Sequence, residues 1–396
     1  MVSRLTWIGL AMLALVPGVA LFLGGVGASD PVRAVLFGIT IVGAAFLLSW
    51  AAEVVQLDFS QGLALALLAL IAILPEYMVD ATFAWLAAED PAYAGYAVAN
   101  MTGANRLLIG IAWPLVVLLV FLRFRRRHVD LEEAHGIELV ALLAATLYAF
   151  ILPFKGSISL IDMVVLVATF VFYMWRVARL PAEEPHLVGP AHLIGGLSPL
   201  PRRAVVIGMA LLAAGAILLV AKPFAKSLVS TGVNLGIDEF LLVQWLAPLA
   251  SEAPEFVVVV LFAWRGAATA ALGTLISSKV NQWTLLVGML PLVYSIALGG
   301  PHALPLDDRQ RGEVLLTAAQ SLFAVTLLLD LRLSLVGAGV LFGLFAVQML
   351  LPDTRTAITI IYLVLAAGAL VRSRRHVSRA FRWLRPERAG VSQEPR

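Results

Sequence analysis

Two Pro-Glu pairs lie inside long apolar stretches, where a carboxylate is costly to bury. Glu76 is in PEYMVDATFAW at 75–85, and Glu255 is in PEFVVVVLFAW at 254–264. A further carboxylate, Glu252, comes one turn before the second pair. Each proline costs a helix one backbone hydrogen bond and frees a carbonyl oxygen. Because hard cations such as Na⁺ and Ca²⁺ take carboxylate and carbonyl oxygens as ligands, both stretches are candidate cation sites.

A polar cluster follows each Pro-Glu stretch. The first is ANMTGAN at 99–105, and the second is LGTLISSKVNQW at 272–283. Their amide and hydroxyl oxygens suit the opposite wall of a cation site, and Gly103 in the first cluster permits close approach of two helices. We therefore predict that each Pro-Glu helix faces the polar cluster that follows it.

The composition is that of a protein that crosses a membrane many times. Of the 396 residues, 61% are hydrophobic and 13% are charged, whereas soluble domains carry about 25% charged residues. Because a spanning helix needs about 20 mostly apolar residues, we predict an all-α polytopic membrane protein with about 12 transmembrane helices (roughly 10–12). The predicted spans are 5–27, 31–54, 61–88, 92–122, 137–153, 158–179, 204–225, 236–264, 267–299, 312–330, 332–351 and 356–372.

The two Pro-Glu stretches also belong to an internal repeat. They match residue by residue at a constant offset, ending in Phe-Ala-Trp at 83–85 and at 262–264. Equivalent elements are five predicted helices apart along the chain, so they cross the membrane in opposite directions. The two five-helix repeats are therefore inverted relative to each other. Secondary transporters have this arrangement, with the substrate site near the midplane. The predicted organisation is an N-terminal transmembrane helix (1–30), a first repeat (31–180), a cytoplasmic linker (181–203), a second repeat (204–355), a last transmembrane helix (356–372) and a basic cytoplasmic tail (373–396).

Arginines gather beside the apolar spans and predict the orientation in the membrane. RFRRRH at 123–128, PRR at 201–203 and the tail after residue 371 fall on one side if the helices alternate from a cytoplasmic N-terminus. This positive-inside pattern predicts an inner or plasma membrane protein with both termini cytoplasmic and with lipids as partners. No basic groove with interleaved aromatics indicates nucleic acid, and the absence of cysteine excludes disulfides and thiolate sites.

The repeated Pro-Glu and polar motifs resemble the calcium/cation antiporter superfamily, which includes the sodium/calcium exchangers. In that family, two inverted alpha repeats supply glutamates and Asn or Asp residues that bind Ca²⁺ or Na⁺ in alternating access. The resemblance implies Glu76 and Glu255 as metal ligands. With the departures considered next, the predicted ion-binding or translocating residues are Glu76, Asn100, Asn105, Ser251, Glu252, Glu255, Thr274, Ser278 and Lys279, with Asp80, Arg106 and Asn281 as secondary members.

The chain departs from the family motifs in ways that bear on the transported ion. The hydroxyl positions of the first motif are Ile71, Ala72 and Ile73, and Lys279 stands where the second repeat of the family has Asn or Asp. Lys279 either pairs with Glu252 or occupies part of the ion site, and in the second case a proton becomes the coupling ion. Arg106 is expected to reach Glu252 or Asp80, or to extend toward the membrane surface.

The leading hypothesis is a secondary-active antiporter that moves Na⁺ or Ca²⁺ against Na⁺ or H⁺. An alternative is an exchanger scaffold whose site is occupied by Lys279 and whose role is regulatory or structural. An intramembrane enzyme with paired carboxylates is a third hypothesis, which no His-Glu metal pattern or activated nucleophile supports. We therefore predict no enzyme activity and no cofactor beyond the transported cations, while the sequence leaves the oligomeric state open.

Overall fold

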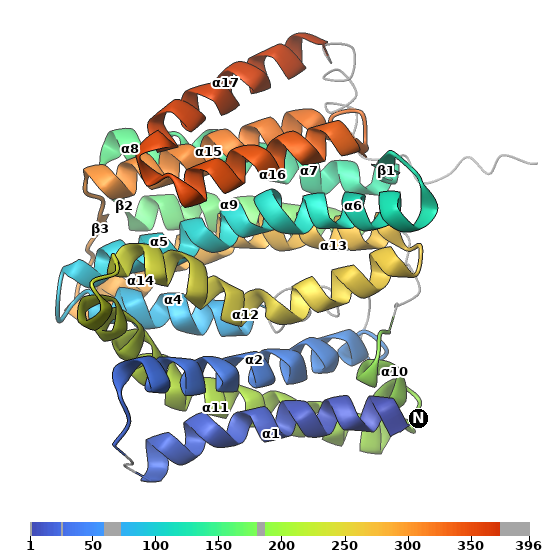
Figure 1. Cartoon of the computed structure of the whole chain (residues 1–396), viewed down its shortest axis with the longest axis vertical. Helices are drawn as coiled ribbons and strands as arrows, with labels where there is room; N and C mark the ends of the chain where they lie inside the picture. Colours follow the sequence, from blue (N-terminus) through green and yellow to red (C-terminus); the bar gives the residue numbers. More distant parts are fainter. Residues whose placement is uncertain (1, 25–26, 59–72, 180–186, 373–396) are drawn as a thin grey trace, which may run out of the picture.

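The computed structural model describes residues 2–24, 27–58, 73–179 and 187–372, which form a bundle of helices lying side by side (Figure 1). Nine of the described helices are long and apolar enough to cross a membrane. Each of the twelve predicted spans contains a described helix, and the span predicted at 61–88 is described from residue 73 onward. The predicted all-α polytopic fold is therefore confirmed.

The helices and strands have the following bounds. The helices before the linker are α1 (Val2–Gly24), α2 (Asp30–Val55), α4 (Leu74–Leu86), α5 (Ala92–Leu107), η1 (Leu108–Ala112), α6 (Trp113–Phe124), η2 (Glu133–His135), α7 (Gly136–Ala149), α8 (Ile151–Lys155) and α9 (Leu160–Val177). Those after it are α10 (Pro190–Gly195), α11 (Pro199–Leu235), α12 (Glu239–Trp264), α13 (Ala268–Asn281), η3 (Gln282–Leu286), α14 (Val287–Leu298), α15 (Asp308–Leu327), α16 (Leu335–Leu350), η4 (Pro352–Thr354) and α17 (Arg355–Arg372). The strands are β1 (His128–Asp130), β2 (Ser157–Ile158), β3 (Leu304–Pro305) and β4 (Arg332–Ser334).

Two short ribbons tie the repeats together. β1 pairs with β4, and β2 pairs with β3, both antiparallel. Each ribbon therefore takes one strand from each half of the chain. The β1 strand lies at the right-hand end of the bundle in Figure 1, and β2 with β3 lies at the left-hand end. Equivalent ribbons at opposite ends are what an inverted pair of repeats requires.

A π-helical turn marks the same place in both repeats. η1 continues α5 into α6, and η3 continues α13 into α14. Each π turn widens the helix locally, and such turns are common at functional sites. The sequence analysis predicted continuous spans at 92–122 and 267–299, so these two turns are an addition that only the structure provides.

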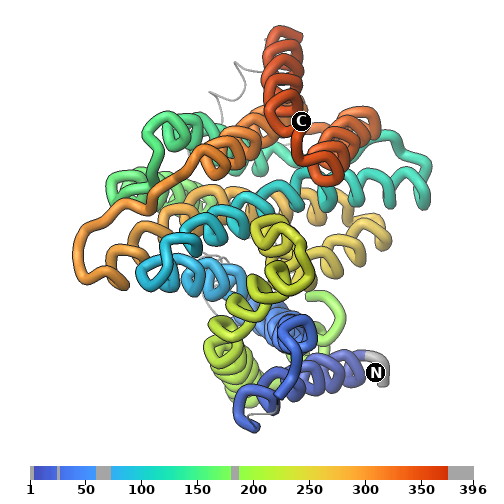
Figure 2. The backbone as a smooth tube through the Cα atoms, turned by 60° about the vertical axis from the view of Figure 1, so that its left-hand side comes forward, coloured from blue at the N-terminus to red at the C-terminus, as the bar shows by residue number. Residues whose placement is uncertain are grey.

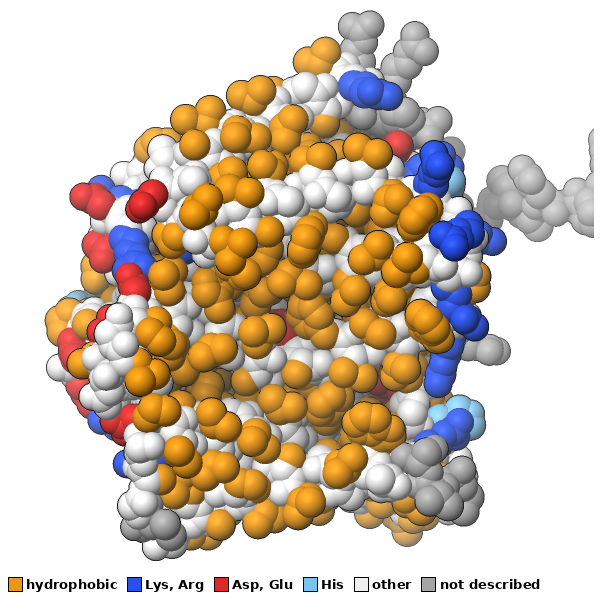
Figure 3. All heavy atoms as spheres, in the orientation of Figure 1, with side chains coloured by type: hydrophobic (Ala, Val, Ile, Leu, Met, Phe, Trp, Pro, Cys, Tyr) orange, Lys and Arg blue, Asp and Glu red, His pale blue; other side chains and the backbone are white. Residues whose placement is uncertain are grey.

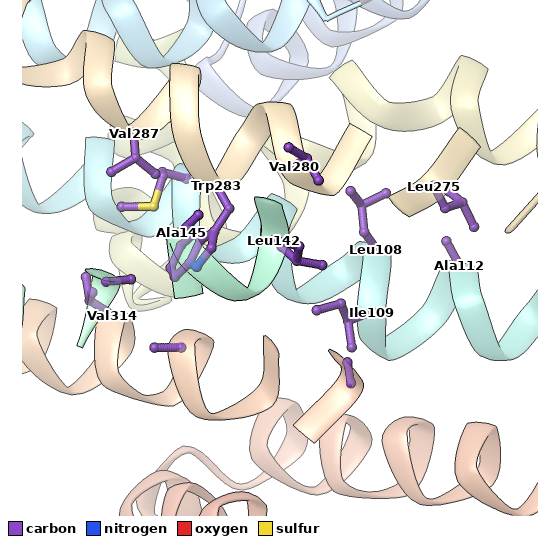
Figure 4. Packing of buried hydrophobic residues seen from close by; sticks show 14 of the residues in the cluster. Leu108, Ile109, Ala112, Leu142, Ala145, Leu275, Val280, Trp283, Val287 and Val314 are labelled. Atoms are coloured by element: carbon purple, nitrogen blue, oxygen red, sulfur yellow. The ribbon is translucent and has the colours of Figure 1, made fainter. Parts of the chain in front are cut away.

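The helices pack into two groups with separate apolar cores. One core joins α1, α2, α10 and α11, and Figure 2 shows α1, α2 and α11 in the lower part of the molecule. The larger core takes in the remaining helices together with parts of α1, α2 and α11, and Figure 4 shows part of it around Trp283 and Leu142. The Pro-Glu helices α4 and α12 pack against both α2 and α11. They therefore lie where the two groups meet.

α11 is longer than predicted. It has 37 residues, which corresponds to about 55 Å at 1.5 Å per residue, whereas the predicted span covers only 204–225. Pro223 lies inside the helix without ending it. The helix ends at Gly236, whose φ of 64° suits glycine. Lys222, in the same part of the helix as Pro223, pairs with Glu89 at the surface, and both side chains are about half exposed.

The surface has an apolar middle and charged ends. Figure 3 shows apolar side chains covering the middle of the visible face, with Lys and Arg along its right edge and Asp and Glu, mixed with some Lys and Arg, along its left edge. The described start of α1 lies at the right-hand end as well (Figure 1). This distribution is the one expected when the helices run from one membrane surface to the other.

Candidate functional site

Three carboxyl groups from the two repeats meet in the interior. Glu76 lies in the first turn of α4, and Glu252 and Glu255 lie in the middle of α12. Glu76 and Glu252 are each only 2% exposed. The carboxyl of Glu252 lies close enough to those of Glu76 and Glu255 to interact with them electrostatically.

Gln282 of η3 connects the carboxyl groups of the two repeats. Its side-chain amide donates to Glu76 Oε2 at 2.9 Å and also to Glu252 Oε1. The Ser278 hydroxyl, one turn earlier, donates to Glu255 Oε1 at 3.1 Å. The structure thus brings the predicted residues Glu76, Glu252, Glu255 and Ser278 together. Gln282 was in the polar cluster but not among the predicted site residues.

α12 is a continuous helix through both of its prolines. Its hydrogen-bond ladder nevertheless loses two N–H donors, because Pro248 and Pro254 have none to offer. The carbonyl of Gln244, four residues before Pro248, then lies against Gly103 of α5, where a Cβ would be only 1.9 Å from the oxygen. Gly103 therefore allows the close approach of α5 and α12.

Lys279 is fully buried and contacts the first repeat. Its Nζ donates to Asn105 Oδ1 at 2.6 Å and to the Asn105 carbonyl oxygen at 3.3 Å. It also lies 4.5 Å from the centre of the Trp283 ring. Of the two arrangements expected for Lys279, pairing with Glu252 is not found among the described residues, where the Gln282 amide donates to Glu252 instead.

A second set of contacts joins the remaining predicted residues of α4 and α5. The Asn100 amide donates to Asp80 Oδ1 at 2.8 Å, and both residues are fully buried. The Tyr77 hydroxyl donates to Asn281 Oδ1 at 2.5 Å and so links α4 to α13. Asp80 lies one helical turn beyond Glu76, so this set adjoins the carboxyl cluster along α4.

The hydroxyls of two predicted residues bond to carbonyls of their own helices and not to the carboxyl groups. Thr274 is exposed, and its hydroxyl donates to the Ala270 carbonyl of its own helix at 2.9 Å. Ser251 is buried, but its hydroxyl donates to the carbonyls of Ala247 and Pro248, both at 3.3 Å. Hydroxyls in helices often bond backward in this way. The motif positions Ile71 and Ala72 lie outside the described residues.

Arg106 belongs to a buried ion-pair network that the sequence analysis did not predict. It reaches neither Glu252 nor Asp80, and it does not extend to the surface. Its guanidinium contacts Glu313 Oε2 of α15 at 2.5 Å and Gln348 Oε1 of α16 at 2.7 Å. A fully buried arginine requires a partner. An acidic residue within another predicted span is therefore the sequence signal that could have predicted this network.

Glu313 is the centre of this network. Arg355 of α17 contacts its Oε1, and Gln244 of α12 donates to its Oε2 at 3.0 Å. The Arg355 guanidinium also donates to Gln244 Oε1 at 3.1 Å. A cavity of about 520 Å³, lined in part by Glu313, Arg355 and Asp238, opens beside the network. The network therefore holds α5, α12 and α15 to one another next to the carboxyl cluster.

The cluster and its surroundings hold buried oxygens that no donor reaches. They are Glu76 Oε1, Asp80 Oδ2, Asn100 Oδ1, Glu252 Oε2, Glu255 Oε2 and Gln282 Oε1. Buried polar atoms normally have partners, so this set of acceptors suits protons or a cation. In the described part of the chain, no three His, Asp or Glu side chains form a ready metal site. A hard cation here would take amide and backbone oxygens as well as carboxylates.

Comparisons with known proteins point to one family. Residues 31–178 and 205–352 match the family described as sodium/calcium exchanger protein. Among solved structures, the H⁺/Ca²⁺ exchanger CAX is 42% identical, with 96% of this chain and 97% of that chain covered and a TM-score of 0.92. No curated protein gave a match.

Two more distant structures share the fold. YfkE is 14% identical, with 91% of this chain and 99% of that chain covered and a TM-score of 0.62. The sodium-calcium exchanger NCX_Mj is 16% identical, with 85% of this chain and 99% of that chain covered and a TM-score of 0.52. At these identities, the likeness concerns the fold alone.

Proposed function

The chain belongs to the sodium/calcium exchanger protein family, and we propose that it exchanges Ca²⁺ for protons across the membrane by alternating access. The observation that carries this proposal is the side-chain amide of Gln282, which donates to both Glu76 and Glu252 and so brings carboxyl groups of the two repeats to one donor. Protons hold such a cluster together, and a divalent cation competes for the same oxygens. The 42% identity to the exchanger CAX, named for H⁺ and Ca²⁺, supports the same pair of ions.

Charge balance favours one divalent cation at this site. With the three glutamates ionised and Lys279 protonated, the site carries three negative charges and one positive charge. The resulting charge of −2 is neutralised either by one Ca²⁺ or by two protons. In the arrangement with protonated carboxyl groups, the side-chain amide of Gln282 donates to both Glu76 and Glu252. The Gln282 Oε1 atom has no hydrogen-bond partner and is available as a further cation ligand.

The site also has the position that alternating access requires. It is built from α4 and α12, which come from different repeats and lie where the two groups of helices pack together. A relative movement of the groups would expose the carboxyl cluster to one membrane surface at a time. We further propose an inner or plasma membrane location with both termini cytoplasmic and with no cofactor beyond the transported ions. The basic side chains at one end of the bundle support this orientation (Figure 3).

Ion flux in proteoliposomes tests the proposal. Liposomes with an acidic interior should accumulate external Ca²⁺ when they contain the protein, and the substitution Glu255→Gln should abolish the uptake. Glu132→Gln is the matched control, because Glu132 is exposed at the surface and lies outside the cluster. Uptake that persists in Glu255→Gln would refute the role of the cluster. Absence of flux for Ca²⁺, Na⁺, K⁺ and H⁺ in the wild type would favour the non-transport scaffold.

A further inference from the structure

Asn105 and Lys279 come from different repeats, and each lies just before the π turn of its own repeat. Asn105 lies three residues before η1, and Lys279 lies three residues before η3. The observed contact between Asn105 and Lys279 therefore joins the two repeats, with an amide on one side and an ammonium group on the other.

The surroundings of the Lys279 nitrogen are those of a bound monovalent cation. Two oxygens of one residue, the Asn105 carbonyl at 3.3 Å and its side-chain Oδ1 at 2.6 Å, face the nitrogen. The Trp283 ring presents its face at 4.5 Å, and aromatic faces attract cations. Figure 4 shows Trp283 close to apolar side chains such as Ala145 of α7. Asn105 and Lys279 are both completely shielded from solvent.

We infer that Lys279 is a specificity-determining residue that acts as a built-in cation and prevents Na⁺ from binding at Asn105. Amide and carbonyl oxygens are ligands that suit Na⁺. In this chain, the lysine side chain occupies them, and its charge further opposes a mobile cation at the same place. The neighbouring carboxyl cluster remains available to Ca²⁺ and protons. This inference rests on the proposed function and identifies which cations the site accepts.

The substitution Lys279→Met tests the inference, because methionine removes the charge while keeping an unbranched side chain. Ca²⁺ uptake by the wild type should be unaffected by a large excess of Na⁺. In Lys279→Met, the same excess should reduce Ca²⁺ uptake by about tenfold or more, which corresponds to a competing Na⁺ site. Lys279→Gln should give the same Na⁺ sensitivity. Lys222→Met is the matched control, since Lys222 is half exposed and pairs with Glu89 at the surface.

Na⁺ indifference that persists in both folded Lys279 variants would overturn the inference. A measurement on the wild type alone keeps it falsifiable if neither variant folds. Radioactive Na⁺ binding to the purified wild type should be negligible, and binding that Ca²⁺ displaces would also overturn the inference. Failure of the proposed function has a different signature, namely a wild type that moves no Ca²⁺ under a pH gradient, and the Na⁺ binding measurement does not depend on that result.

Discussion

The substitution Glu313→Gln removes the only carboxylate that the described structure places against Arg106 and Arg355. Arg106 is fully buried, and the Arg355 side chain is only 14% exposed. Glutamine keeps the size of the side chain but leaves two guanidinium groups without an anion. The loss should therefore be much larger than for a surface ion pair.

The expected magnitude follows from the burial of the network. Removing one partner of a buried ion pair typically costs about 3–5 kcal/mol, because the remaining charge is left uncompensated. Here two positive charges lose the same partner. We therefore expect the free energy of unfolding to fall by an amount at the upper end of that range. Replacing Arg106 by Gln in the same chain should recover part of the loss, since one unpaired charge is then removed as well.

Thermal unfolding of purified protein in detergent measures this effect. We expect the Tm of Glu313→Gln to fall by several degrees relative to the wild type, and the double variant with Arg106→Gln to lie above it. Glu89→Gln serves as the control, because Glu89 forms an exposed pair with Lys222 and should change the Tm little. A Tm for Glu313→Gln equal to that of the wild type would show that the network does not stabilise the fold.

Three further outcomes are expected. Gly103→Ala should lower the free energy of unfolding by about 1–3 kcal/mol or more, because the new Cβ would lie 1.9 Å from a backbone oxygen of α12. Gly215→Ala should leave the free energy of unfolding unchanged, because a Cβ there would have no neighbour within 4 Å. Gln282→Leu should weaken Ca²⁺ binding by about 10–100-fold, and equal calorimetric affinities would contradict its role. The hydrogen bond from Arg202 holds the pKa of Asp58 below its ordinary value, so Asp58 stabilises the fold at neutral pH and this contribution is lost as the pH falls through that lowered pKa. The Tm difference between wild type and Asp58→Asn should therefore shrink in acid. A difference that does not depend on pH would contradict the stabilising role of ionised Asp58.

Much of the fold could be predicted from the sequence because its determinants are local or repeated. Apolar length predicts the spans, and the matched stretches ending in Phe-Ala-Trp predict the repeat. The π turns could not be predicted, since they depend on how α5 and α13 pack and leave no pattern in residue type.

The sequence singles out the carboxylates of the candidate site but not the side chains that contact them. Glu76 and Glu255 stand out because each follows a proline in an apolar stretch. Gln282 does not, because the direction of its side chain depends on the π turn that begins with it. Glu313 lies in a span with no counterpart to the Pro-Glu motif, and only its contact with Arg106 reveals it.

Proton release on Ca²⁺ binding tests the central claim most directly. Purified wild-type protein in weakly buffered detergent solution is titrated with Ca²⁺ while the pH is recorded. Because the cation and the protons compete for the same carboxyl oxygens, we expect about two protons to be released for each Ca²⁺ bound. The release should disappear in Glu252→Gln and in Glu255→Gln. Ca²⁺ binding without proton release, or release that persists in both variants, would contradict the account.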